Sequence, residues 1–132
     1  MLVKVPERTN EKVTGQLAQF PYFTLKCKLS EVLKNRGLTM KELSALTGIR
    51  IAALSEMNNL KRSSVNIPHL VVIAQVLRID EISDLFEFVM PDDTKEVFER
   101  DKAIIEKSGV LPEQEEFLSI IRKDKKKKPT SN

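Results

Sequence analysis

Residues 34–62 concentrate positive charge: six lysines and arginines stand there against two glutamates, a net charge of +4. Residues 63–121 carry five basic side chains against thirteen acidic ones, and residues 122–132 carry six against one, giving −8 and +5. A basic segment in a chain with such an acidic body supplies the attraction that binding to nucleic-acid phosphates requires. An ordinary solvated surface is the alternative, and charge alone does not decide between them. The six basic residues are Lys34, Arg36, Lys41, Arg50, Lys61 and Arg62.

The elements that would hold these side chains are encoded in residues 38–62, LTMKELSALTGIRIAALSEMNNLKR. Thr39 and Glu42 form a capping box, which predicts a helix that begins at about Met40. Gly48 allows the turn that follows, because glycine adopts a left-handed backbone without steric cost. Two short helices joined by a tight turn are typical of a helix-turn-helix, whose second helix lies in the DNA major groove. The apolar residues assigned to the core of these helices are Leu43, Leu46, Ile49, Leu54 and Met57.

Further helices flank this motif on both sides. A helix over about 26–36 ends at Gly37, where a glycine is favoured after the last turn. Asn66 caps a fourth helix that tolerates Pro68 in its first turn, and a short fifth helix spans about 81–88. These two helices follow a polar loop over 58–65 and bring the predicted domain to five helices.

Residues beyond Pro91 form a separate part of the chain, because proline interrupts the helical pattern there. A sixth helix begins with two aspartates at 92 and 93 and stops at Ser108 and Gly109, and Pro112 opens a seventh. We expect the Lys-rich residues 122–132 to be disordered. The predicted organisation has four parts, which are an N-terminal arm over 1–24, a helix-turn-helix domain over 25–90, a helical extension over 91–121 and the tail over 122–132.

From about Leu25 to Met90 the sequence resembles the Cro and lambda-repressor type of helix-turn-helix, often called the XRE family. The resemblance implies an all-α fold, here a five-helix repressor-like domain with two additional C-terminal helices and flexible termini. It also implies sequence-specific binding to double-stranded DNA, usually as a dimer. The residues that carry it are Leu29, Leu33, Gly37, Leu38, Thr39, Leu43, Gly48, Ile49, Asn59, Lys61, Arg62, Leu70, Ile73, Ala74, Leu77, Leu85 and Phe86.

The resemblance implies which side chains meet DNA. The first residues of the third helix would touch base edges, and in this sequence they are Arg50, Ile51, Ala52 and Ser55. Arg50 would bind a phosphate or a guanine, and Ile51 and Ala52 would pack on thymine methyl groups. Glu56 would accept from cytosine, or would repel unwanted sequences. The remaining candidates would contact DNA at the edge of this surface, mostly at phosphates. The complete candidate site is Thr39, Lys41, Arg50, Ile51, Ala52, Ser55, Glu56, Asn59, Lys61, Arg62 and Ser63.

The sequence departs from the family pattern at several of these positions. Met40 stands where a glutamine usually holds a phosphate, and Arg50 stands where a serine or threonine usually caps the recognition helix. Ile51 and Ala52 replace polar residues that read bases, and Leu60 replaces a common glycine. The predicted reading surface therefore has few hydrogen-bonding groups, which leaves open a use of the third helix for another purpose.

Other functional classes find little support in the composition. The single histidine, His69, and the single cysteine, Cys27, form no metal-ligand spacing, and we predict no enzyme activity and no cofactor. One cysteine cannot form an internal disulfide and fits a reducing cytoplasm. The first residues do not resemble a signal peptide, and no apolar run reaches the roughly 18 residues that a membrane span needs. We therefore expect a cytoplasmic protein without a membrane partner.

Two functions remain. The first is a transcriptional regulator, a repressor of phage or mobile-element type, which binds double-stranded DNA as a homodimer joined through residues 92–121. The second is an adaptor or antitoxin-like module, which uses the apolar surface at Ile51 and Ala52 to bind a regulatory protein partner. The lysine run at 125–128 either adds phosphate affinity or only solubilises the tail.

Overall fold

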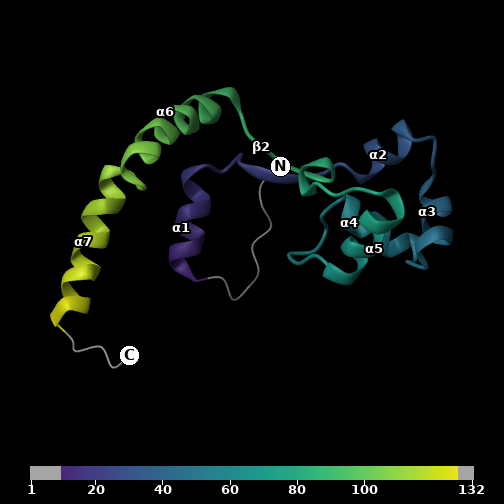
Figure 1. Cartoon of the computed structure of the whole chain (residues 1–132), viewed down its shortest axis with the longest axis horizontal. Coiled ribbons are helices and arrows are strands. Elements are labelled where there is room, and N and C mark those ends of the chain that lie inside the picture. The colour runs from purple at the N-terminus through teal and green to yellow at the C-terminus, as the bar shows by residue number, and fades with distance from the viewer. Residues whose placement is uncertain (1–9, 128–132) are drawn as a thin grey trace. The chain divides into compact units, whose positions relative to one another are not determined.

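The computed structural model of the chain describes residues 10–127, with the side chains of 124–127 left out, and Figure 1 shows its elements. The chain divides after Pro91 into two units, which we call the first and the second unit. The first unit holds α1 (Glu11–Gln19), β1 (Thr24–Cys27), α2 (Leu29–Asn35), α3 (Met40–Thr47), α4 (Ile51–Asn58), α5 (Ile67–Leu77), the 3₁₀ turn η1 (Ile82–Asp84) and β2 (Phe86–Val89). The second unit holds α6 (Asp92–Ser108) and α7 (Pro112–Lys127). The predicted helical fold is confirmed, with a small two-stranded sheet added to it.

The predicted start of the motif is confirmed in atomic detail. The Thr39 hydroxyl accepts from the amide of Glu42 at 3.1 Å, and the Glu42 carboxylate accepts from the amide of Thr39 at 2.9 Å. This reciprocal capping box satisfies two of the amides that the first turn of α3 leaves without helical partners. Asn66 likewise caps α5, because its side-chain oxygen accepts from the amide of His69 at 3.1 Å.

A single aliphatic core holds α2, α3, α4 and α5 together. Leu29, Leu43, Leu54 and Ile73 come one from each of these helices, and all four are essentially inaccessible to solvent. Burying a leucine or isoleucine side chain contributes roughly 1.5–3 kcal/mol relative to leaving it exposed. The helix-turn-helix is therefore positioned by side chains that converge from four helices on one point. The other buried members of the core are Cys27, Leu33, Ile49, Leu77 and Leu85.

Three helices of this unit end in the same hydrogen-bonded arrangement, with a residue in the left-handed region after the last turn. At the end of α2 this residue is Gly37, and the amide of Leu38 donates to the carbonyl of Leu33 at 2.8 Å. Leu60 after α4 (φ 48°) and Arg78 after α5 (φ 54°) occupy the same position without being glycine. Such a backbone costs a non-glycine residue about 1–2 kcal/mol. Leu60 offsets part of this cost, because its side chain packs against the core.

The predicted fifth helix over 81–88 is wrong. That segment forms the single turn η1 and then β2, which pairs antiparallel with β1 in the register Thr24↔Val89 to Cys27↔Phe86. The alternation of apolar and polar residues in Phe-Glu-Phe has the period of a strand, not of a helix. The first predicted helix also begins later, at Leu29, because residues 24–27 belong to β1. The sheet places Phe88 against Phe23, whose rings stack with centroids 5.1 Å apart.

The N-terminal segment contains a helix that the sequence reading described as an irregular arm. Asn10 caps α1 by accepting from the amide of Val13 at 3.0 Å, and the helix continues to Gln19. Val13, Thr14 and Gly15 are weak helix formers, which hides this helix from a propensity-based reading. Residues 1–9 of the predicted N-terminal arm lie outside the described residues.

The second unit consists of two helices in sequence. The predicted end of α6 at Ser108 and Gly109 and the predicted start of α7 at Pro112 are confirmed. Helix α7 continues to Lys127, so the tail expected to be disordered from residue 122 is helical over its first half. No side chain described in α6 or α7 is buried. Within residues 10–127, none of the helices has the length and apolar character to cross a membrane.

Candidate nucleic-acid interface

Helix α4 is anchored from one side and open on the other. Leu54, near its centre, is fully buried, whereas Arg50, Ile51 and Ala52 at its beginning are exposed. Ile51 leaves 47% of its surface accessible, although it is a large apolar side chain. Arg50 takes the cap position of α4 without a side-chain capping bond, so its guanidinium is not used to hold the helix end. These three residues form the surface that the sequence predicted for contact with bases.

The turn between α3 and α4 is fixed by hydrogen bonds on both sides of Gly48. The Ser44 hydroxyl donates to the carbonyl of Ile49 at 2.5 Å, and the Thr47 hydroxyl accepts from the amide of Ile49 at 3.1 Å. Gly48 has φ 79° and donates its amide to the carbonyl of Ser44 at 2.9 Å. The short hydroxyl side chains therefore set the angle at which α4 leaves α3.

We expect Gly48→Ala to lower the free energy of unfolding by about 1 kcal/mol, through backbone strain alone. A Cβ at Gly48 would meet no atom within 4 Å, but the left-handed φ remains unfavourable for alanine. Gly15→Ala in α1 is the matched control, since its Cβ also meets nothing and its backbone is helical. Urea unfolding followed by circular dichroism measures both variants. An unchanged midpoint for Gly48→Ala would show that the turn tolerates a side chain.

The loop after α4 carries the remaining candidates, and an ion pair ties it back to the helix. The Arg62 guanidinium donates to the Glu56 carboxylate at 2.8 Å, and this hydrogen bond is the main reason why the pKa of Glu56 lies below its usual value. The sequence reading assigned both side chains to DNA, whereas the structure pairs them with each other. Their exposed fractions of 40% and 72% leave the pair open to exchange with a phosphate.

Asparagines at the end of α4 connect the candidate surface to α2. The Asn58 side chain accepts from the amide of Ser30 at 3.0 Å, which supplies a cap that Lys28 at the start of α2 does not provide. Asn59 is exposed and its amide nitrogen donates to the Ser55 hydroxyl at 3.5 Å. The sequence does not predict this role of Asn58, because Asn58 and Ser30 are 28 residues apart and no local pattern links them.

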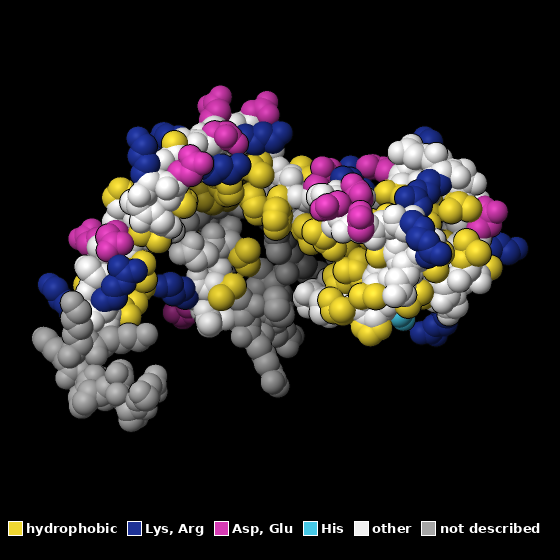
Figure 2. All heavy atoms as spheres, in the orientation of Figure 1, with side chains coloured by type: hydrophobic (Ala, Val, Ile, Leu, Met, Phe, Trp, Pro, Cys, Tyr) yellow, Lys and Arg dark blue, Asp and Glu magenta, His cyan; other side chains and the backbone are white. Residues whose placement is uncertain are grey.

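The basic residues of segment 34–62 do not all have the same role. The Arg36 guanidinium donates to the backbone carbonyl of Leu77 and so ties α2 to the end of α5. Lys34, Lys41, Arg50 and Lys61 are exposed. Lysine and arginine side chains are visible over the face of the first unit that Figure 2 shows. Arg36 is therefore assigned to the fold, and the predicted DNA contacts Lys41, Arg50 and Lys61 are exposed as such a role requires.

One residue that was assigned to the core lies at the surface. Leu46 of α3 is 59% exposed, whereas Leu43, one turn earlier, is fully buried. The two leucines lie on the same side of α3, but only Leu43 is covered by neighbouring elements of the core. Thr39, Lys41 and Ser63 are exposed as well, at the start of α3 and in the loop after α4.

The fold and the exposed helix α4 together define a helix-turn-helix DNA-binding domain. Residues 28–92 match the family model of the Cro/C1-type helix-turn-helix DNA-binding domain. This segment belongs to that family, which confirms the resemblance found in the sequence and supports a DNA-binding regulator. Comparison of the chain with curated proteins and with solved structures gives no match.

Proposed function

We propose that the protein is a sequence-specific transcriptional regulator of double-stranded DNA, a repressor of phage or mobile-element type. The observation that carries the proposal is α4 itself, which belongs to a DNA-binding family, is anchored by Leu54 and presents Arg50, Ile51 and Ala52 to solvent. In such domains the second helix of the motif enters the major groove and its first residues reach base edges.

The chemistry of these side chains determines what they can recognise. The guanidinium of Arg50 donates to a phosphate or to both acceptors of a guanine, and the aliphatic Ile51 and Ala52 contact thymine methyl groups. The exposed groups around them, which include Lys41 and Asn59, serve phosphates and fix the register of the domain on the duplex. DNA recognition would therefore depend on one charged side chain, Arg50, and on the fit of apolar side chains to the groove, more than on a series of hydrogen bonds to bases.

Dimer formation would be the task of the second unit. Its two helices carry apolar residues but contain no buried side chain among those described, so they have no core of their own. Two copies joined through residues 92–121 would present two α4 helices to half-sites about one helical turn, roughly 34 Å, apart. We therefore infer an inverted-repeat operator and a cytoplasmic homodimer.

The test is a titration of the protein against DNA fragments that flank its own gene, at 50 and 200 mM salt. Saturable binding to one fragment that persists at the higher salt would support the proposal, because sequence-independent binding is erased first. Equal affinity for all fragments at the lower salt, with none left at the higher, would contradict it. The fragment that binds then supplies the operator for all further measurements.

We expect Glu56→Gln to raise DNA affinity, by about tenfold at low salt. The substitution removes the negative charge that holds Arg62 at 2.8 Å beside the predicted contact surface, and the neutral amide oxygen that remains is a weaker acceptor for the guanidinium. The logarithmic dependence of affinity on salt should steepen by about one unit, as Arg62 gains a phosphate. Glu99→Gln in α6 is the control with the same chemical change. A lower affinity of Glu56→Gln would instead identify Glu56 as a base reader.

The second candidate function is a protein-interaction module on the same scaffold. It is favoured by the exposure of Ile51 and by an apolar hollow of 550 Å³ on the side of the sheet. Ile51→Asp distinguishes the surfaces in a co-purification experiment: loss of a defined partner would place it on α4, and its retention would exclude α4 as the contact. The hollow is lined by Leu25, Val65, Leu70, Ile82, Ser83, Phe86, Glu87 and Phe88.

A further inference from the structure

Helix α7 has an apolar group at its centre that the described part of its own unit does not bury. Ile120 and Ile121 are 60% and 41% exposed, and Leu118 beside them is only half-buried. Figure 2 shows apolar side chains gathered along one side of α6 and α7, with charged side chains along the other. Most of the stability of a helix in a protein comes from packing of its apolar face and not from its intrinsic propensity. The helix therefore needs a partner of complementary shape.

The charges of α7 are arranged with opposite signs at its two ends. Its first five residues, 112–116, contain three glutamates and no basic residue. Its last six residues, 122–127, contain five basic residues and one aspartate. The apolar group at 117–121 lies between them, so that the whole pattern is symmetrical about Ser119 with the sign of charge reversed. The acidic end also lies at the helix N-terminus, where the macrodipole favours it.

We propose that α7 pairs with α7 of a second copy in antiparallel orientation, with the twofold axis near Ser119. The pairing rests on the homodimer proposed above, gives it a specific geometry and extends its interface beyond residue 121 to the end of α7. A parallel pair would place acidic halves together and basic halves together, whereas an antiparallel pair places each acidic half beside a basic one. Packed helices lie 8–10 Å apart, about one Debye length at moderate salt, so this difference acts across the whole interface.

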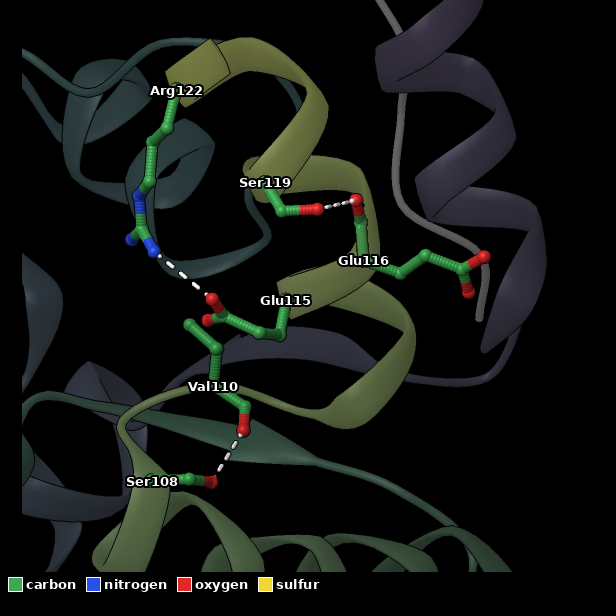
Figure 3. Close-up of polar contacts among 6 residues, drawn as sticks. All are labelled: Ser108, Val110, Glu115, Glu116, Ser119 and Arg122. Atoms are coloured by element: carbon green, nitrogen blue, oxygen red, sulfur yellow. Dashed lines mark hydrogen bonds and ion pairs between the residues drawn. The ribbon is translucent and has the colours of Figure 1, made fainter.

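The contacts within the second unit hold α7 ready for such a pairing. The Ser108 hydroxyl donates to the carbonyl of Val110 at 2.8 Å (Figure 3). The Gln114 side chain accepts from the amide of Leu111 at 2.8 Å, which fixes where α7 begins. Glu115 and Arg122 form an ion pair of 3.1 Å along one face of the helix (Figure 3). Both remain more than half exposed, so their charges also act on a neighbouring helix.

The interface is self-complementary, and this identifies a second copy as its occupant. A surface that pairs with itself about a twofold axis must match each feature at one end with its counterpart at the other. Helix α7 meets this condition. In the antiparallel pair the glutamates of each copy face the basic residues of the other, and the two apolar groups face each other. A partner of uniform charge, such as a nucleic acid, would attract one half of the helix and repel the other.

The experiment measures self-association of the full chain by analytical ultracentrifugation at 50 and 500 mM NaCl. It uses a variant with a basic first half, a variant with an acidic second half, and a swapped variant that carries all six changes. The first is Glu113→Lys, Glu115→Lys and Glu116→Lys, and the second is Arg122→Glu, Lys123→Glu and Lys126→Glu. Helicity is followed by circular dichroism, because lysines at a helix N-terminus weaken the helix in the first and the swapped variants alike.

At 50 mM NaCl we expect each half-reversed variant to associate at least about tenfold more weakly than the wild type. The swapped variant should regain most of that affinity, and an equimolar mixture of the two half-reversed variants should form heterodimers. Ile121→Asp should abolish association, because it places a charge within the apolar group. High salt should weaken the wild-type dimer, since it screens attraction between opposite halves.

Three results would overturn the pairing: a wild-type chain that stays monomeric, a dimer that strengthens with salt, or half-reversed variants that associate as well as the wild type. Each variant is also titrated against DNA that contains one half-site. Because a half-site needs only one domain, unchanged half-site affinity separates failure of the pairing from failure of the DNA-binding proposal. Loss of half-site binding by the wild type itself would count against the proposed function instead.

Discussion

Replacing Leu54 with alanine is expected to lower the free energy of unfolding of the first unit by about 3 kcal/mol. Leu54 is the only buried residue of α4, and it meets the buried side chains of α2, α3 and α5 in one core. The substitution removes three buried carbon atoms and leaves a cavity that the surrounding helices fill only in part. Because native domains are stable by roughly 5–15 kcal/mol, this loss is a large share of the total.

Leu46→Ala is the matched control for this prediction. It makes the same chemical change one helix earlier, at a side chain that is 59% exposed, and should alter the free energy of unfolding by less than about 0.5 kcal/mol. Denaturant unfolding followed by circular dichroism measures both variants. Equal losses in the two would contradict the anchoring of α4 by Leu54 and would restore Leu46 to the core, where helical spacing had placed it.

The difference between these leucines shows how far the sequence determines the core. Helical spacing correctly identified Leu43 and Leu54, because each stands in a helix with apolar residues one turn away. It could not exclude Leu46, because exposure depends on which neighbouring helix packs at that level. The spacing of apolar residues shows which side of a helix faces the core. How many of the residues on that side are buried depends on the neighbouring elements that pack against it.

Structure that depends on residues close in sequence was easier to predict than contacts between distant residues. The capping box of Thr39 and the left-handed Gly48 depend on residues close in sequence, and both were predicted. The pairing of β1 with β2 joins strands about 60 residues apart, so only the two-residue alternation of Phe86–Val89 gave any indication of it. Helix and strand patterns are hard to separate in segments of four residues.

The sequence predicted where the candidate site lies, but it did not predict the ion pair that forms within it. The exposure of Arg50, Ile51 and Ala52 follows from the place of α4 in the motif and agrees with the sequence reading. The ion pair between Glu56 and Arg62 depends on how the chain turns at Leu60, a non-glycine residue at a left-handed position. No pattern in the sequence predicts that turn, because leucine is disfavoured there.

Arg50→Ala should reduce affinity for the operator by about ten- to a hundredfold, the range expected when one good charged contact to a base is lost. Arg50 is the only charged residue among the exposed ones at the start of α4, and no side-chain capping bond engages it. Its guanidinium is therefore available to DNA without breaking an existing helix cap. The measurement is a titration of the operator fragment at two or more salt concentrations.

The same variant separates the two ways in which Arg50 can act. If it binds a phosphate, Arg50→Ala should weaken binding to all sequences alike and reduce the salt slope by about one. If it binds a guanine, affinity for the operator should fall while affinity for unrelated DNA changes little. Arg100→Ala in α6 is the control, because it removes the same exposed charge outside the helix-turn-helix. Unchanged operator affinity in Arg50→Ala would exclude Arg50 as a DNA contact and would leave the apolar Ile51 and Ala52 as the candidate readers at the start of α4.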